Sequence, residues 1–332
     1  MSAKSYRTPA RPVATPPAPS TRPLPAAPDY VRPPVRPLNL EELAGLGSLP
    51  LRARVLADAL GAGGHSSRRK GASVEFADYR DYQPGDDLRR IDWRLYGRTD
   101  RLHLRETHEE TPLRVVLLLD VSQSMAFASR AGLLTKLDYA RTLLGALALL
   151  LRRQREVCGA GVLANELVRW APPSASPLRQ QVLWSLLDAP PVALPTALPA
   201  ALTQVLDVAP RRCLFVLASD FYEVPENLAP LLRRLHFERH DLLALQVADP
   251  AEVDFPFEDP AIFQDIESGD RLAADPAALA RGYRERFARH RRAIGDLCAG
   301  HGFDALALRT DEAPLATLRD CLVRRLTRRR PA

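Results

Sequence analysis

The chain is poor in the features that mark secreted, zinc-binding and membrane-spanning proteins. It has four cysteines in 332 residues and no CxxC pair, so neither a disulfide framework nor a cysteine-ligated zinc site is expected. No apolar signal-peptide region is visible near the N-terminus. The longest apolar run, Leu143–Leu151, is less than half of the roughly 20 residues that cross a bilayer as a helix. We therefore expect a cytoplasmic protein with reduced thiols.

The body of the chain also lacks an excess of basic charge. The net charge is +6, but residues 1–37 contribute +5 and residues 324–332 another +5, which leaves about −4 on residues 38–323. A surface that binds nucleic acid needs an excess of Lys and Arg, so nucleic acid is not an expected partner. The two basic ends are suited to peripheral contact with acidic proteins or with a membrane surface.

Composition divides the chain into four parts. Residues 1–37 hold eleven prolines and few large apolar side chains, which is typical of a disordered, proline-rich tail. Residues 38–113 open with an amphipathic helix that Asn39 can cap, and continue as a small, mainly β subdomain rich in charges and aromatic side chains. Residues 114–325 form the main domain, and residues 326–332 form a basic end.

The main domain alternates between short apolar runs and longer amphipathic stretches. Continuous apolar strands separated by helices predict an α/β fold, with a mostly parallel, Rossmann-like sheet that is covered by helices on both faces. Residues 250–276 interrupt this pattern and contain a hairpin turn at Glu267–Asp270. The expected strands are Val115–Leu119, Gly159–Ala164, Leu214–Ala218, Leu242–Val247 and Ala305–Leu308. The expected helices are Lys136–Arg153, Leu178–Leu187, Leu198–Val208, Asn227–Phe237 and Pro276–Cys298, with a last one from Thr310 to the basic end.

Oxygen-bearing side chains follow the expected strands where these end. In the sequence RVVLLLDVSQSM, Asp120 comes directly after an apolar strand, and Ser122 and Ser124 follow at alternate positions. Because ligands of parallel α/β sheets gather at the carboxyl ends of the strands, these side chains should meet there. Carboxylate and hydroxyl oxygens suit Mg²⁺ or Mn²⁺. The predicted metal ligands are Asp120, Ser122, Ser124, Thr196 and Asp220.

These residues resemble the metal ion-dependent adhesion site of von Willebrand factor A domains. That site has an Asp-x-Ser-x-Ser loop, here DVSQSM at Asp120–Met125, followed by a threonine and a later aspartate, here Thr196 and Asp220. The resemblance implies that the hydroxyls coordinate the ion directly and that the aspartates often act through water. The chain departs from the pattern at Ala197, where many members of the family carry an aspartate.

A second resemblance covers roughly residues 40–325. The segment Glu75–Glu106, together with Asp265–Leu272 and Tyr283–Arg292, is similar to the bacterial domain-of-unknown-function 58 family. This resemblance implies a von Willebrand factor A-like domain and a MoxR-type AAA+ ATPase as partner, with a chaperone-like role in assembly, maturation or stress response. It implies no reaction. Many relatives begin with two membrane spans, where this chain has its proline-rich tail.

Each of these patterns also has a simpler interpretation. Ser and Asp at a strand–helix junction cap helices without any metal. The segment Glu75–Glu106 holds seven arginines and eight acids, which favours an internal network of salt bridges over a partner-binding surface, and both over RNA binding. If the segment does dock a partner, the contact residues we expect are Arg80, Asp86, Asp87, Arg90, Asp92 and Trp93.

Three classes of function remain open. The first is a non-catalytic adaptor or scaffold that binds a protein carboxylate through a divalent ion. The second is a metal-dependent phosphoester hydrolase. It is disfavoured because a haloacid-dehalogenase-type site needs a second carboxylate where Ser122 stands, and a serine hydrolase needs a histidine partner for its serine. The third is a structural module with a degenerate metal site, which the substitution at Ala197 would favour.

Overall fold

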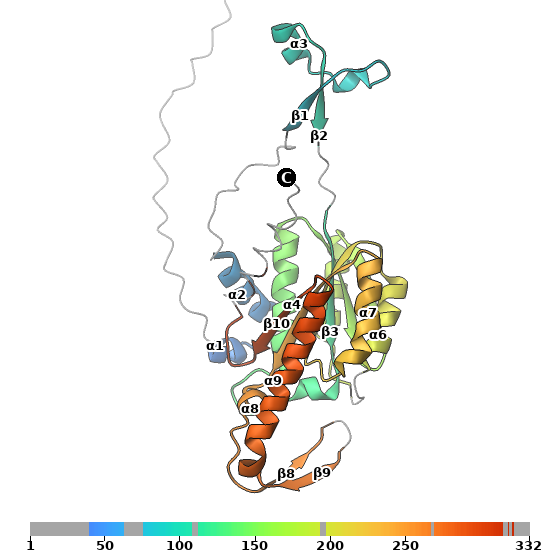
Figure 1. Cartoon of the computed structure of the whole chain (residues 1–332). Helices are drawn as coiled ribbons and strands as arrows, with labels where there is room; N and C mark the ends of the chain where they lie inside the picture. The colour runs from blue at the N-terminus through green and yellow to red at the C-terminus, as the bar shows by residue number, and fades with distance from the viewer. Residues whose placement is uncertain are drawn as a thin grey trace, which may run out of the picture. The chain divides into compact units, whose positions relative to one another are not determined.

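The main domain is a mixed α/β structure built on a six-stranded sheet (Figure 1). The computed structural model describes residues 40–62, 76–107, 112–192, 197–266, 269–314, 318 and 321. The strand order is β10-β7-β6-β3-β4-β5, with β5 antiparallel to β4 and the other neighbours parallel. The mostly parallel sheet expected from the sequence is thereby confirmed. The strands are β3 (Arg114–Asp120), β4 (Val157–Leu163), β5 (Leu167–Ser174), β6 (Cys213–Ser219), β7 (Asp241–Ala248) and β10 (Asp304–Arg309).

Both faces of the sheet are covered, which explains the continuous apolar strands. In β3, Leu117 and Leu119 belong to a core with α1, α2, α4 and α5, whereas Val116 and Leu118 face α6, α7 and α9. Alternate side chains of one strand thus enter opposite cores. The helices are α1 (Leu40–Gly45), α2 (Leu49–Ala62), α4 (Lys136–Arg153), α5 (Pro177–Leu187), α6 (Leu198–Val208), α7 (Pro225–Phe237), α8 (Pro250–Asp254) and α9 (Pro276–Gly300). In the described residues, no helix is long and apolar enough to span a bilayer.

Two features of the fold differ from the sequence prediction. The amphipathic stretch after Asn39 forms two helices, α1 and α2, separated by Leu46–Ser48, and Asn39 itself lies outside the described residues. Strand β5 was not predicted because Pro172 and Pro173 lie inside it. Proline is tolerated in β5 because this strand is at the edge of the sheet. Of the predicted last helix, only Leu318 and Cys321 are described, both as helical.

Residues 76–107 contain a small antiparallel unit. Strand β1 (Phe76–Asp81) pairs with β2 (His103–Thr107), and between them lie the 3-10 turn η1 (Leu88–Arg90) and α3 (Trp93–Thr99). Asp87 caps η1, and Asp92 caps α3 by accepting hydrogen bonds from the N–H groups of Arg94 and Leu95. The unit is therefore ordered by its own acidic side chains.

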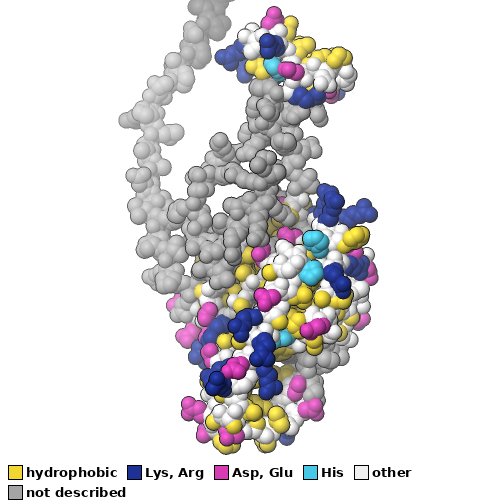
Figure 2. All heavy atoms as spheres, viewed as in Figure 1, with side chains coloured by type: hydrophobic (Ala, Val, Ile, Leu, Met, Phe, Trp, Pro, Cys, Tyr) yellow, Lys and Arg dark blue, Asp and Glu magenta, His cyan; other side chains and the backbone are white. Residues whose placement is uncertain are grey.

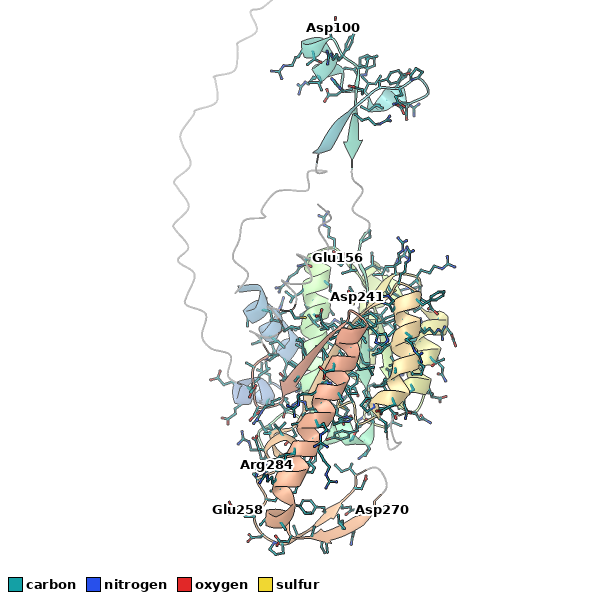
Figure 3. All side chains as sticks on the ribbon, in the orientation of Figure 1. Asp100, Glu156, Asp241, Glu258, Asp270 and Arg284 are labelled. Atoms are coloured by element: carbon teal, nitrogen blue, oxygen red, sulfur yellow. The ribbon has the colours of Figure 1, made fainter. Side chains whose placement is uncertain are left out.

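The interruption after α8 is a second hairpin, β8 (Ala261–Gln264) and β9 (Arg271–Ala274). Phe255 joins it to α9, because its ring stacks on Phe263 at 5.7 Å and lies 4.5 Å from the ring of Tyr283. Figure 3 shows Asp270 on the hairpin and Arg284 on the neighbouring helix. Ile262 and Leu272 are 69% and 63% exposed, and hydrophobic side chains are visible at this end of the molecule in Figure 2.

Candidate functional site

The candidate site lies between the carboxyl ends of β3 and β6. These strands are hydrogen-bonded neighbours, although the chain passes through β4 and β5 on the other side of β3 before it returns to form β6. Such a reversal of direction opens a crevice where ligands of α/β sheets bind. Asp120 is the last residue of β3, and Ser219 is the last residue of β6, with Asp220 next in the chain.

Asp120 is fully buried and accepts two hydrogen bonds. Its Oδ1 accepts the backbone N–H of Ser122 at 2.9 Å, and its Oδ2 accepts the hydroxyl of Ser219 at 2.6 Å. The hydroxyl oxygen of Ser219 in turn accepts the N–H of Phe221 at 3.0 Å. These bonds fix the carboxylate and the two loops that follow β3 and β6.

Burial, the largest cause, and the negative charge of Asp220 together raise the pKa of Asp120 to about 7, against the hydrogen bonds from Ser219 and Ser122, which lower it. Desolvation dominates because an ionised carboxylate loses its hydration in the interior. A cation beside Asp120 would favour its ionised form.

Ser122 and Ser124 present their hydroxyls side by side. Ser122 is at the N-cap position of the 3-10 turn η2 (Gln123–Ala126), and its Oγ lies 3.1 Å from the Oγ of Ser124. Adjacent ligands of an octahedral Mg²⁺, each about 2.1 Å from the ion, are about 3.0 Å apart. The two hydroxyls are therefore spaced as two adjacent ligands of a hard divalent cation would be. Capping alone does not explain Ser122, because its side chain makes no cap hydrogen bond.

Asp220 has a different partner. Its Oδ2 lies 2.9 Å from the Nζ of Lys136, the first residue of α4, and the same ammonium lies 2.7 Å from Glu252 Oε1 in α8. Burial alone would lower the pKa of Lys136, but the charges of Asp220 and Glu252 outweigh burial and raise it. The lysine therefore stays charged, and Asp220 forms an ion pair with it.

Thr196, the remaining predicted ligand, lies outside the described residues, so its role stays a prediction. The described residues on either side of residues 193–196 are held at the carboxyl ends of the strands by backbone hydrogen bonds. Val192 donates its N–H to the carbonyl of Val121 at 2.8 Å, and Ala197 donates its N–H to the carbonyl of Ala164 at 3.3 Å. In the part of the chain that the structure describes, no group of three or more His, Cys, Asp and Glu side chains is arranged to hold a metal ion.

The sequence matches a known protein family. The family model "Protein of unknown function DUF58" matches residues 78–294. The chain belongs to the DUF58 family. The uncharacterized protein Rv1480 of Mycobacterium tuberculosis is 30% identical over 281 residues, which cover 83% of this chain and 87% of the relative.

Two solved structures are similar to this DUF58 chain over about two thirds of its length. One is the conserved hypothetical protein BatB from Bacteroides thetaiotaomicron, with 15% identity, a TM-score of 0.40, and coverage of 65% of this chain and 98% of that one. The other is the VWA domain of SpRpn10, with 10% identity, a TM-score of 0.36, and coverage of 65% and 95%. Because these scores are low, the fold is assigned from strand order and core packing.

The predicted partner-binding residues lie in and around η1 and α3, and several have structural roles. Arg80 pairs with Asp86 at 2.8 Å, which holds the pKa of Asp86 below its ordinary value, and Asp86 also accepts the N–H of Gln83. Asp87 and Asp92 act as caps. The side chain of Arg90 lies outside the described residues. The internal network expected from the sequence is therefore present, and partner binding by these residues stays a prediction.

Trp93 differs from its neighbours because it is exposed. Its side chain is 62% exposed and contacts Tyr96 edge-to-face at 6.2 Å, while Leu88 nearby in sequence is 58% exposed. Burial therefore does not account for a tryptophan and a leucine at these positions. Exposed aromatic side chains of this kind are common anchors of protein interfaces.

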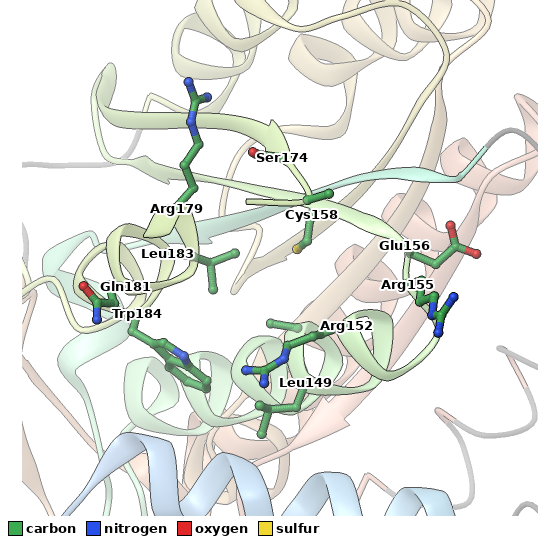
Figure 4. Close-up of a pocket in the computed structure, with 12 residues that line it drawn as sticks. Leu149, Arg152, Arg155, Glu156, Cys158, Ser174, Arg179, Gln181, Leu183 and Trp184 are labelled. Atoms are coloured by element: carbon green, nitrogen blue, oxygen red, sulfur yellow. The ribbon is translucent and has the colours of Figure 1, made fainter. Parts of the chain in front are cut away.

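A cavity of about 610 Å³ lies near the amino ends of the strands, opposite the candidate site. It is lined by Arg152, Cys158 and Trp184 among others (Figure 4). Cys158 pairs with Val115 near the start of β3, whereas Asp120 pairs with Leu163 at its end. Burial raises the pKa of Cys158 to about 12, so its thiol is a poor nucleophile. This cavity is therefore separate from the candidate site.

The sequence interpretation missed the partners that surround the predicted ligands. Lys136 was recognised as the start of a helix but not as a buried cation, since Asp220 and Glu252 are 84 and 116 residues away from it. Ser219, the donor to Asp120, is not among the residues predicted from the sequence. The available signal is a lysine at the first position of a helix whose middle, Leu143–Leu151, is apolar.

Proposed function

We propose that this DUF58 protein is a non-catalytic, cation-dependent adaptor that works in the cytoplasm with a MoxR-type AAA+ ATPase. The observation that carries the proposal is the group formed by buried Asp120 and the paired hydroxyls of Ser122 and Ser124 at the crevice of the sheet. A Mg²⁺ or Mn²⁺ ion held there supplies positive charge that attracts an acidic side chain of a partner. Asp120 provides the one charged ligand, and the serine hydroxyls provide neutral ones.

The surroundings of the two serines support binding over hydrolysis. Their hydroxyls are hydrogen-bonded to each other, and the hydroxyl of Ser219 donates a hydrogen bond to Asp120. His290, on α9, directs its Nε2 to the carbonyl of Phe221 at 2.7 Å. In the described part of this edge, neither Ser122 nor Ser124 has the histidine partner that activates a nucleophilic serine. A screen of generic phosphoesters with Mg²⁺ or Mn²⁺ tests the hydrolase alternative, which predicts turnover that is lost in Asp120→Ala.

The ATPase partner is proposed from the family resemblance, and the exposed surface of α3 offers it a place to bind. Trp93 and Leu88 are exposed apolar side chains of a segment that also carries the charged side chains of Arg80, Asp86 and Asp87. An apolar anchor with a polar rim is the usual anatomy of a protein interface. We propose that this surface contacts the ATPase and that the Asp120 site contacts an acidic group of the client.

The test is affinity capture with purified protein in Mg²⁺ and in EDTA. Wild type should retain an acidic client in Mg²⁺ and release it in EDTA, and Ser124→Ala should lose Mg²⁺-dependent capture while its circular dichroism stays native. Asp207→Ala, which removes an exposed aspartate paired with Arg234, is the matched control and should behave like wild type. Equal capture by wild type and Ser124→Ala, or capture that is indifferent to EDTA, would contradict the proposal.

A further inference from the structure

Lys136 is a built-in cation at the same edge of the sheet as the candidate site. It is 0% exposed, and its ammonium is shared by Asp220 at 2.9 Å and Glu252 at 2.7 Å. The ring of Tyr222 adds a cation–π contact at 4.6 Å. Burying an ammonium costs folding free energy unless a carboxylate pairs with it. We therefore expect Asp220 and Glu252 to be held in place by their pairing with Lys136.

The partners of Lys136 are themselves fixed. Glu252 accepts Lys136 through Oε1 and the backbone N–H of Asp249 through Oε2, the latter at 2.9 Å as part of a capping box. Asp249 is fully buried and accepts the N–H of Ser129, in the loop that follows η2, at 3.0 Å. The position of the ammonium is therefore defined by α4, by the loop after β6 and by α8.

This arrangement changes the charge that is available to a metal ion. Asp220 stands where the family resemblance places a metal-ligating aspartate, but its carboxylate is paired with Lys136. The charges of Asp220 and Lys136 cancel, and Glu252 is held against the same ammonium. Asp120, by contrast, accepts its two hydrogen bonds from uncharged groups, the N–H of Ser122 and the hydroxyl of Ser219.

We propose that Lys136 sets the charge of the cation site: by pairing with Asp220 and Glu252, it leaves a divalent ion with Asp120 as its one carboxylate ligand. An ion held in this way keeps a net positive charge and recruits an acidic group from another protein. The inference rests on the proposed function and assigns Lys136 as a positioning residue, because it does not touch the ion itself.

The pairing of Lys136 has two opposite effects. It lowers the affinity of the site for a divalent cation, and it leaves more positive charge on the cation that binds. Affinity for divalent cations rises with the number of charged ligands, so freeing Asp220 should tighten cation binding. The same change would neutralise the bound ion and weaken its attraction for a carboxylate of a partner. Lys136 therefore lowers the affinity of the site for the ion and preserves the positive charge with which the ion attracts a carboxylate of a partner.

The test is Mn²⁺ titration by calorimetry, together with thermal unfolding with and without Mn²⁺. Lys136→Met should bind Mn²⁺ at least tenfold more tightly than wild type and gain a larger increase in Tm from the ion. Lys136→Met with Asp220→Asn has the same net charge as wild type and removes both members of the pair. This double variant should bind Mn²⁺ within about threefold of wild type, and it remains informative if the single variant does not fold without the ion.

Two outcomes would overturn the inference. One is a folded Lys136→Met that binds Mn²⁺ no more tightly than wild type. The other is a tenfold or greater loss of affinity in the double variant, which would make Asp220 a ligand of the ion. If wild type takes up no Mn²⁺ while Lys136→Met does, the cation-dependent capture proposed above fails, but the role of Lys136 in setting the charge is supported.

Discussion

Asp120 and Ser219, 99 residues apart in the chain, are joined by a 2.6 Å hydrogen bond between the ends of two neighbouring strands. The same serine oxygen accepts the N–H of Phe221, which has a φ of 55° in the left-handed region. The bond therefore connects the loop that carries the paired serines with the turn that carries Asp220. Each half of the candidate site depends on the other for its position.

Removing this link should destabilise the protein. Ser219→Ala leaves Asp120 Oδ2 and the N–H of Phe221 without their partner in a buried environment, which costs about 1–3 kcal/mol of unfolding free energy. Urea denaturation measures this change. Ser185→Ala, which removes an exposed hydroxyl bonded to the carbonyl of Val182, should change the unfolding free energy by less than about 0.5 kcal/mol. Equal stability of both variants would contradict the structural role of Ser219.

Asp120 should make stability fall as the pH rises. Its pKa is about 7 in the folded protein and 3.8 in an unfolded chain, so between these values the folded state holds a proton that the unfolded state has released. The contribution of Asp120 to the free energy of unfolding is fully present below about pH 4, and it is lost as the pH rises towards 7. At about 1.4 kcal/mol per pH unit, the interval sets an upper limit of about 4 kcal/mol.

Asp120→Asn tests this pH dependence, because asparagine does not titrate. Relative to wild type, the variant should gain unfolding free energy between pH 4 and pH 7, measured in EDTA so that no cation favours the ionised carboxylate. A difference between the two proteins that stays constant over this range would show that Asp120 has an ordinary pKa.

The edge strand β5 can be tested through a glycine that faces it. A Cβ at Gly159 would lie 2.6 Å from the carbonyl oxygen of Ala171 and from the nitrogen of Pro173. Gly159→Ala should therefore cost about 1–3 kcal/mol of unfolding free energy. Gly295→Ala, inside α9 with no atom within 4 Å of the added Cβ, should instead stabilise by about 0.5–1 kcal/mol. Thermal unfolding of the two variants should show shifts in Tm of opposite sign.

Trp93 should matter for partner capture and little for folding. Because its side chain is 62% exposed, Trp93→Ala should change the unfolding free energy by less than about 0.5 kcal/mol. Capture of the MoxR-type ATPase should fall at least tenfold, as expected for an aromatic anchor. Phe237→Ala, at an 86% exposed phenylalanine at the end of α7, is the matched control. Undiminished capture by Trp93→Ala would remove this surface from the proposal.

The sequence predicts the fold well where the signal is local. The predicted bounds of α4 and α6 agree with those observed, Lys136–Arg153 and Leu198–Val208, because apolar periodicity and turn residues define both helices. The predicted strands differ from β3, β4, β6, β7 and β10 by one or two residues at each end. Asp120, Ser122 and Ser124 were also predictable as a group, since they are consecutive alternate residues of one loop.

The remaining features depend on contacts that are distant in sequence. Burial of Lys136 follows from Asp220 and Glu252, which belong to other elements, and a helix-opening lysine is exposed in most proteins. Likewise, β5 forms against β4 in spite of two prolines, because an edge strand needs hydrogen bonds on one side only. Helix and strand propensities and apolar periodicity show neither the ion pairs of Lys136 nor the pairing of β5 with β4.

The most direct test of cation binding is an anomalous diffraction map of crystals grown with Mn²⁺. We predict a peak about 2.2 Å from the Oγ atoms of Ser122 and Ser124, next to Asp120, with the Lys136 ammonium still paired with Asp220 and Glu252. A map without a peak at saturating Mn²⁺, or an ion bound by Asp220 with Lys136 displaced, would contradict this account.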